Sequence, residues 1–188
     1  KMFFNCLREV KIILASGDEE AIMDMITRSN GAISENSVIK FPTRIDTDIF
    51  RPVDMLSARK LLNLPQNTII VVTTGRLAQL KGWKFMIDCF TLFQKKYKQS
   101  MMYFVGGGED FNSIKEYILI NGLNDIVILT GEKSREEISL YLNSADLFIM
   151  GSYKEGWSTS LSEAVACGVP SCVTAFSSAK EIIDEGKT

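Results

Sequence analysis

The chain has 188 residues, of which 46% are hydrophobic and 23% are charged, and its formal net charge is -2. This balance is typical of a globular domain with a real core and excludes a disordered segment. The low net charge provides no basic field, so we expect no nucleic-acid partner. The sequence contains no histidine, which excludes a Ser-His-Asp triad and a Cys-His dyad within this chain.

The four cysteines, Cys6, Cys89, Cys167 and Cys172, form no CxxC pair. They are therefore predicted to be free core thiols in a reducing cytoplasm, and the spacing does not favour a zinc site. No apolar run approaches the roughly 18–20 residues that a membrane-spanning helix needs.

The beginning of the chain differs in pattern from the rest. Residues 12–15 predict a strand, residues 18–29 an amphipathic helix and residues 38–41 a second short strand. Because so small a unit cannot bury its own core, we interpret residues 1–40 as the tail of a preceding domain. Residues 41–67 are predicted to form a hinge and a connecting helix.

From residue 68 onward, short apolar runs alternate with amphipathic helical patterns. The runs cover residues 69–73, 102–105, 126–129, 147–150 and 171–174. Continuous β-branched and aromatic runs are typical of strands that are buried on both faces of a parallel sheet. Residues 68–188 therefore predict an α/β domain with a doubly wound, Rossmann-like parallel sheet. The pattern ends on a helix, so we expect the C-terminal end of this domain to be incomplete.

The loop after the first of these strands has residues suited to an anion. Gly75 opens the loop, and Arg76 and Lys81 add two full charges before a helix begins. Arginine grips phosphate oxygens in a bidentate manner, and lysine acts as a point charge. An exposed basic loop with a helix cap explains the same residues equally well. Gly107 and Gly108, in the next strand-to-helix turn, permit close approach of a ligand, although a tight turn alone would look the same.

The loop after residue 150 carries the strongest signal. Glu155 lies in the loop, and Glu163 lies eight positions later on the following helix. Ser158, Thr159 and Ser160 are suited to cap that helix and to leave free N–H groups for a phosphate. A carboxylate at such a crevice accepts hydrogen bonds from sugar or ribose hydroxyls. The alternative, a glutamate that favours the helix dipole, explains Glu163 but not Glu155.

Asp46-Thr47-Asp48 resembles an Asp-x-Asp metal site on a sugar nucleotide. The triplet precedes the main domain and is followed by Phe50-Arg51-Pro52, so a turn with local Asx hydrogen bonds is favoured. We therefore expect no metal.

In their order along the chain, these motifs resemble family 4 of the retaining GT-B glycosyltransferases. The resemblance rests on residues 75–82, residues 105–109, and Glu155-x7-Glu163 followed by Ala164-x-Ala166-Cys167-Gly168-x-Pro170; residues 41–52 resemble the linker that opens the C-terminal domain of that family. The linker has Thr43-Arg44 where the family usually has Asn-Gly, and Trp157 occupies a position that is often Phe.

The resemblance implies that the chain is the C-terminal, donor-binding half of a GT-B enzyme preceded by the tail of the acceptor-binding domain. It implies that Arg76 and Lys81 hold the donor diphosphate, that Glu155 binds the sugar and that Glu163 binds the ribose. The implied catalytic residues are Arg76, Lys81 and Glu155, and the implied donor-binding residues are Gly75, Gly107, Gly108, Lys133, Gly156, Trp157, Ser158, Thr159, Ser160, Leu161 and Glu163.

The resemblance further implies a UDP-, GDP- or ADP-sugar donor, no cofactor, and a glycan or glycolipid acceptor bound mainly by the other domain. A cytoplasmic role in polysaccharide biosynthesis is expected, and the resemblance leaves open a peripheral membrane association of the full-length protein. The fragment alone is expected to be inactive. Two alternatives remain open from the residues: a sugar-nucleotide epimerase of the same fold, and a non-catalytic nucleotide-sugar-binding module.

Overall fold

The main body of the protein is a parallel five-stranded sheet with the strand order β5-β4-β3-β6-β7. The computed structural model describes residues 10–17, 19–41, 43–176 and 178–183. The strands are β3 (Ile69–Thr74), β4 (Ser100–Val105), β5 (Val127–Gly131), β6 (Leu147–Met150) and β7 (Ser171–Val173). This arrangement confirms the predicted doubly wound α/β fold.

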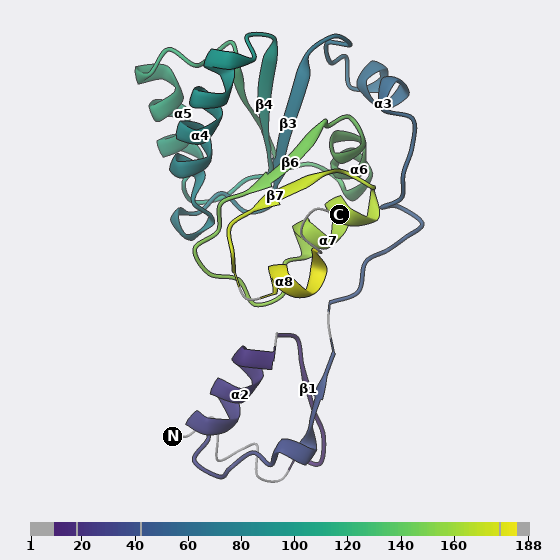
Figure 1. Cartoon of the computed structure of the whole chain (residues 1–188), viewed down its shortest axis with the longest axis vertical. Helices are drawn as coiled ribbons and strands as arrows, with labels where there is room; N and C mark the ends of the chain where they lie inside the picture. The colour runs from purple at the N-terminus through teal and green to yellow at the C-terminus, as the bar shows by residue number, and fades with distance from the viewer. Residues whose placement is uncertain (1–9, 18, 42, 177, 184–188) are drawn as a thin grey trace.

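Helices cover both faces of this sheet (Figure 1). One face carries α4 (Trp83–Lys96) and α5 (Phe111–Ile120). The other carries α3 (Met55–Leu61), α6 (Arg135–Asn143), α7 (Thr159–Ala166) and the short α8 (Ala179–Ile182). None of the helices in the described ranges is long and apolar enough to cross a bilayer.

The core alternates along the central strands. In β3, Ile70 and Val72 pack into the cluster under α6 and α7, whereas Val71 packs into the cluster under α4 and α5. In β4, Val105 packs into the cluster under α6 and α7, and Phe104 packs into the cluster under α4 and α5. All five side chains are at most 2% exposed, which explains why consecutive residues of these strands are apolar.

The topology reverses next to β3. The chain builds β3, β4 and β5 in one direction and then returns to place β6 on the opposite side of β3. Residues Val71 and Val72 pair in parallel with Leu147 and Phe148, so the carboxyl ends of β3 and β6 lie at the same edge. Open α/β sheets bind ligands at such a reversal.

A buried arginine joins the connecting helix to the sheet. Arg59 of α3 is 3% exposed and donates to the carbonyl of Ser144 at 2.9 Å and to Asp146 Oδ2 at 2.7 Å. The same carboxylate oxygen accepts the backbone N–H of Ile70 at 2.7 Å. The residues before β3 are thus fixed to the sheet by ionic contacts as well as by packing.

The early part of the chain forms a separate two-stranded parallel sheet. Its strands are β1 (Ile13–Ala15) and β2 (Val38–Lys40), and α2 (Glu19–Arg28) connects them before the short helix η2 (Glu35–Ser37). The helix α2 has no buried residue, and Leu14 and Ile39 are exposed. Among the described residues of this part, only Ala32 and Ile33 are buried hydrophobics, and neither core cluster includes them. So little burial is the physical reason for interpreting residues 1–40 as part of a preceding domain, and that division stays a prediction.

Local signals in the sequence account for several element ends. Ser134 and Glu137 form the predicted capping box at the start of α6. The cysteine prediction was partly wrong: Cys167 is buried, but Cys89 and Cys172 are exposed. Cys89 falls on the solvent face of α4, and Cys172 lies on β7, the edge strand. Cys6 lies outside the described residues.

Candidate functional site

Three loops meet at the carboxyl ends of β4, β3 and β6. The loop after β3 bonds to the loop after β4 through Gly75 N to Val105 O at 3.0 Å and Leu77 N to Gly107 O at 2.8 Å. It bonds to the loop after β6 through Tyr153 N, which donates to Leu80 O at 3.0 Å. The loop that carries Arg76 and Lys81 is therefore held between the other two.

Glycines permit this close approach. Gly82 has φ +66°, and a Cβ built on it would lie 2.1 Å from the carbonyl oxygen of Gly151. Gly106 has φ +150°, and its Cβ would lie 2.0 Å from the carbonyl oxygen of Gly75. A side chain at either position would force the loops apart.

The structure brings Lys81 and Glu155 into direct contact. Lys81 Nζ donates to Glu155 Oε1 at 2.5 Å, and the Ser152 hydroxyl donates to the same oxygen at 2.7 Å. The Glu155 side chain is only 11% exposed, whereas that of Lys81 is 34% exposed. These two residues, 74 positions apart, were predicted to face one ligand, and the structure places their side chains against each other.

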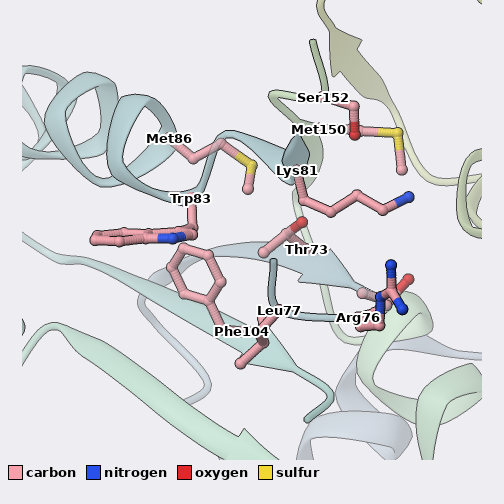
Figure 2. A pocket seen from close by; sticks show the side chains of 11 residues that line it. Thr73, Arg76, Leu77, Lys81, Trp83, Met86, Phe104, Met150 and Ser152 are labelled. Carbon is pink, nitrogen blue, oxygen red and sulfur yellow. The ribbon is translucent and has the colours of Figure 1, made fainter. Parts of the chain in front are cut away.

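Arg76 lies at the open side of the same site. Its side chain is 70% exposed, and its Nε lies 3.9 Å from Glu109 Oε2. In Figure 2 the charged ends of Arg76 and Lys81 extend toward the same side of a pocket, away from Trp83. The pocket wall between them includes Thr73 and Thr74. Both cations therefore lie at one opening, each beside a carboxylate.

The N-terminus of α7 adjoins these cations. Ser158 is the N-cap, and its hydroxyl accepts the backbone N–H of Leu161 at 3.3 Å. The Ser160 hydroxyl would lie 3.0 Å from a Cβ built on Gly75, so the first turn of α7 touches the loop after β3. Thr159, at the first helical position, is exposed. Unbonded N–H groups and the helix dipole favour an anion here.

Glu163 lies in the second turn of α7 and is half-buried. Burial raises the pKa of its carboxyl from the ordinary value of 4.5 to about 7, and the positive charge of Arg135 partly opposes this rise. Arg135 in turn lies 3.4 Å from Asp46 Oδ2. A carboxyl with a raised pKa, and with no hydrogen bond from any residue that the structure describes, suits a group that a ligand completes.

Other predicted site residues lie apart from this opening. Lys133 pairs with Glu137 at 3.3 Å beyond β5, at the edge of the sheet. Gly156 faces the carbonyl of Ser16, 3.8 Å from its built Cβ, and Lys40 lies over the Trp157 ring at 5.9 Å from its centroid. The loop after β6 thus reaches toward the early part of the chain.

The Asp46 triplet forms a turn, as predicted. Asp46 Oδ1 accepts the backbone N–H of Asp48 at 3.2 Å, and Asp46 Oδ2 is occupied by Arg135. No cluster of metal-ligating side chains occurs within the described part of the chain.

The polar residues Thr73, Thr74 and Ser152 of the pocket were missed by the sequence analysis. Ser152 is 1% exposed and bonds to Glu155. Thr74 is 7% exposed, and its hydroxyl has no hydrogen-bond partner among the residues that the structure describes. Each lies at or just beyond the carboxyl end of a strand, which was the available signal.

Comparisons with known proteins identify the family of this chain. The family model for glycosyl transferases group 1 matches residues 54–188. The D-inositol 3-phosphate glycosyltransferase of Arthrobacter sp. is 26% identical over 152 residues, which are 78% of this chain and 36% of the relative.

Two solved structures have the same fold. Sucrose-phosphate synthase from Thermosynechococcus elongatus has a TM-score of 0.80 at 22% identity and covers 95% of this chain and 44% of its own. HepE from Anabaena in complex with UDP-glucose has a TM-score of 0.79 at 21% identity, and the match covers 96% of this chain and 49% of the HepE chain. The chain spans about a third of the curated relative and less than half of each solved structure. This chain belongs to the group 1 glycosyltransferases and has the fold of the GT-B enzymes.

Proposed function

We propose that the chain supplies the donor site of a retaining glycosyltransferase, which moves a hexose-type sugar from a nucleoside diphosphate to an acceptor hydroxyl. The observation that carries the proposal is the meeting of Arg76, Lys81 and the N-terminus of α7 at the reversal between β3 and β6. Two cations and a helix N-terminus suit a diphosphate. The complex of HepE with UDP-glucose supports a donor of this class.

The proposed chemistry places charge stabilisation on the protein. As the bond from the sugar to the leaving phosphate breaks, negative charge grows on that phosphate, and Arg76, Lys81 and the α7 N-terminus stabilise it. Glu155 positions the sugar through its hydroxyls, and Glu163 accepts hydrogen bonds from the ribose. The leaving phosphate serves as the base, in keeping with a chain that lacks histidine.

The remaining assignments follow the family resemblance. The donor is a UDP-, GDP- or ADP-sugar that needs no metal, and the acceptor is a glycan or glycolipid in a cytoplasmic polysaccharide pathway. Residues 68–188 bind the donor, and residues 1–40 belong to the domain that binds most of the acceptor. Without the rest of that domain, these 188 residues bind the donor and do not transfer the sugar.

The test replaces each cation separately in a protein that joins this chain to its acceptor-binding half. Arg76→Ala and Lys81→Ala are each expected to lower kcat about 10²–10³-fold, because each removes a preorganised charge from the leaving group. Lys95→Ala, at the exposed end of α4, is the control and should leave kcat unchanged. Near wild-type turnover in either cation variant would refute the phosphate assignment.

Calorimetric titration of the 188-residue chain with UDP, GDP and ADP identifies the base. One nucleotide is expected to bind at least about tenfold more tightly than the others. Absence of binding by all three would contradict the proposal. Binding without transfer by the protein that joins both halves would instead identify a non-catalytic module.

A further inference from the structure

Glu155 Oε1 accepts two side-chain hydrogen bonds. One comes from the partly exposed Lys81 ammonium at 2.5 Å, and the other comes from the hydroxyl of the buried Ser152 at 2.7 Å. Ser152 is 1% exposed, and its hydroxyl is engaged by Glu155 although the residue lines the pocket. We therefore expect its effect on the donor sugar to act through Glu155.

Ser152 itself is fixed by its surroundings. Its carbonyl oxygen accepts the Thr174 hydroxyl at 2.6 Å, and the Thr174 N–H donates to Met150 O at 3.0 Å. The preceding residue, Gly151, is in close contact with Gly82. The backbone of Ser152 is thus fixed next to the ends of β6 and β7, which limits the movement of its short side chain. The Lys81 ammonium, in contrast, is carried by a long, partly exposed side chain.

We expect donor binding to affect the two hydrogen bonds to Glu155 differently. A diphosphate that engages Lys81 competes with Glu155 for the ammonium, because both are anionic and Lys81 carries a single positive charge. When Lys81 turns to the phosphate, Ser152 still donates to Glu155 Oε1. A carboxylate that is only 11% exposed is kept in place by such a donor.

We propose that Ser152 is a positioning residue that keeps the Glu155 carboxylate directed at the donor sugar after Lys81 has moved to the diphosphate. This inference rests on the proposed donor site. In this proposal the two partners of the ion pair bind different parts of the donor. Lys81 binds the phosphate, and Glu155 binds the sugar through hydrogen bonds that Ser152 keeps aligned.

The experiment compares nucleotide and nucleotide-sugar binding to the 188-residue chain by calorimetry, with UDP and UDP-glucose or GDP and GDP-mannose as probes. Ser152→Ala is expected to leave the affinity for the nucleoside diphosphate within about twofold of wild type. The same variant should weaken the nucleotide sugar about tenfold, the effect of losing one hydrogen bond to a charged group. Ser152→Thr, which keeps the hydroxyl, should restore most of that affinity.

A purely structural role would give a different result. Ser144→Ala serves as the matched control, because it also removes the hydroxyl of a fully buried serine. That hydroxyl donates to Tyr141 O at 2.7 Å and not to Glu155. Equal weakening of both ligands by Ser152→Ala, or no weakening of either, would overturn the proposal. If Ser152→Ala does not fold, Thr174→Val tests the same arrangement from the other side and should weaken only the nucleotide sugar. Failure of wild type to bind any nucleoside diphosphate would refute the donor site itself.

Discussion

Replacement of Glu163 by glutamine is expected to stabilise the unliganded protein at alkaline pH while it weakens donor binding. Glu163 is half-buried, and burial raises the pKa of its carboxyl to about 7. Charging this group in the folded state therefore costs free energy that the unfolded chain does not lose. Glutamine has nearly the same shape and does not ionise, so it removes that cost.

The sign follows from proton linkage. Below about pH 4.5 the carboxyl is protonated in both states, and the wild type is as stable as the variant. As the pH rises toward 7, the unfolded chain releases the proton first, and the folded state loses stability. The rise in pKa from 4.5 to about 7 corresponds to at most about 3 kcal/mol at 1.36 kcal/mol per pKa unit. Partial exposure of the carboxyl reduces this to about 1–2 kcal/mol.

Urea unfolding near pH 5 and near pH 8 measures this difference. Glu163→Gln should raise the free energy of unfolding by about 1–2 kcal/mol near pH 8 and by much less near pH 5. Glu136→Gln, at an exposed position of α6, is the matched control and should change stability little at either pH. A loss of stability near pH 8, or a gain of equal size at both values, would refute the reasoning.

The same variant should bind a nucleoside diphosphate about 10–100-fold more weakly near pH 8, because it loses a charged acceptor for the ribose hydroxyls. A rise in stability together with a fall in affinity is what a binding residue produces and what a core residue does not. Unchanged affinity would remove Glu163 from the proposed ribose contact.

Three further changes test other parts of the structure. Thr74→Val replaces a buried hydroxyl without a described partner by a methyl of similar size, and thermal unfolding should show a gain of about 1 kcal/mol; a loss would reveal a bond to that hydroxyl. Arg59→Met should cost about 1–3 kcal/mol in urea unfolding, whereas the exposed neighbour in Lys60→Met should cost little. Glu155→Gln should release Lys81, so calorimetry should detect about threefold tighter binding of a plain nucleoside diphosphate and weaker binding of the nucleotide sugar; weaker binding of both would contradict the pairing.

The sheet was predictable because each of its strands contains a short run of consecutive apolar residues. Burial on both faces, as at Ile70 and Val71, leaves a continuous signal in the sequence. The capping box at Ser134 was equally local, since both of its partners lie within one helical turn. Physical effects confined to a few neighbouring residues can be read without the fold.

The contacts within the site depend on distant parts of the chain and escaped the sequence analysis. The ion pair of Lys81 with Glu155 exists because Gly82 and Gly151 let two loops approach to backbone contact. The hydrophobic periodicity of the sequence does not indicate that two distant loops approach each other. The sequence analysis did not single out Ser152, whose hydroxyl is connected to the site only by its hydrogen bond to Glu155 Oε1 at 2.7 Å.

The site without its donor is close to electrically neutral, and this bears on how it selects a ligand. Arg76 lies beside Glu109, and Lys81 is bonded to Glu155, so each cation already has a carboxylate. A simple anion gains less from these cations than their number suggests, because it must displace carboxylates to reach them. A nucleotide sugar can compensate, since its hydroxyls offer the displaced Glu155 new donors. Binding then favours a molecule that carries phosphate and sugar together over phosphate alone. This preference arises from the ion pair between Lys81 and Glu155.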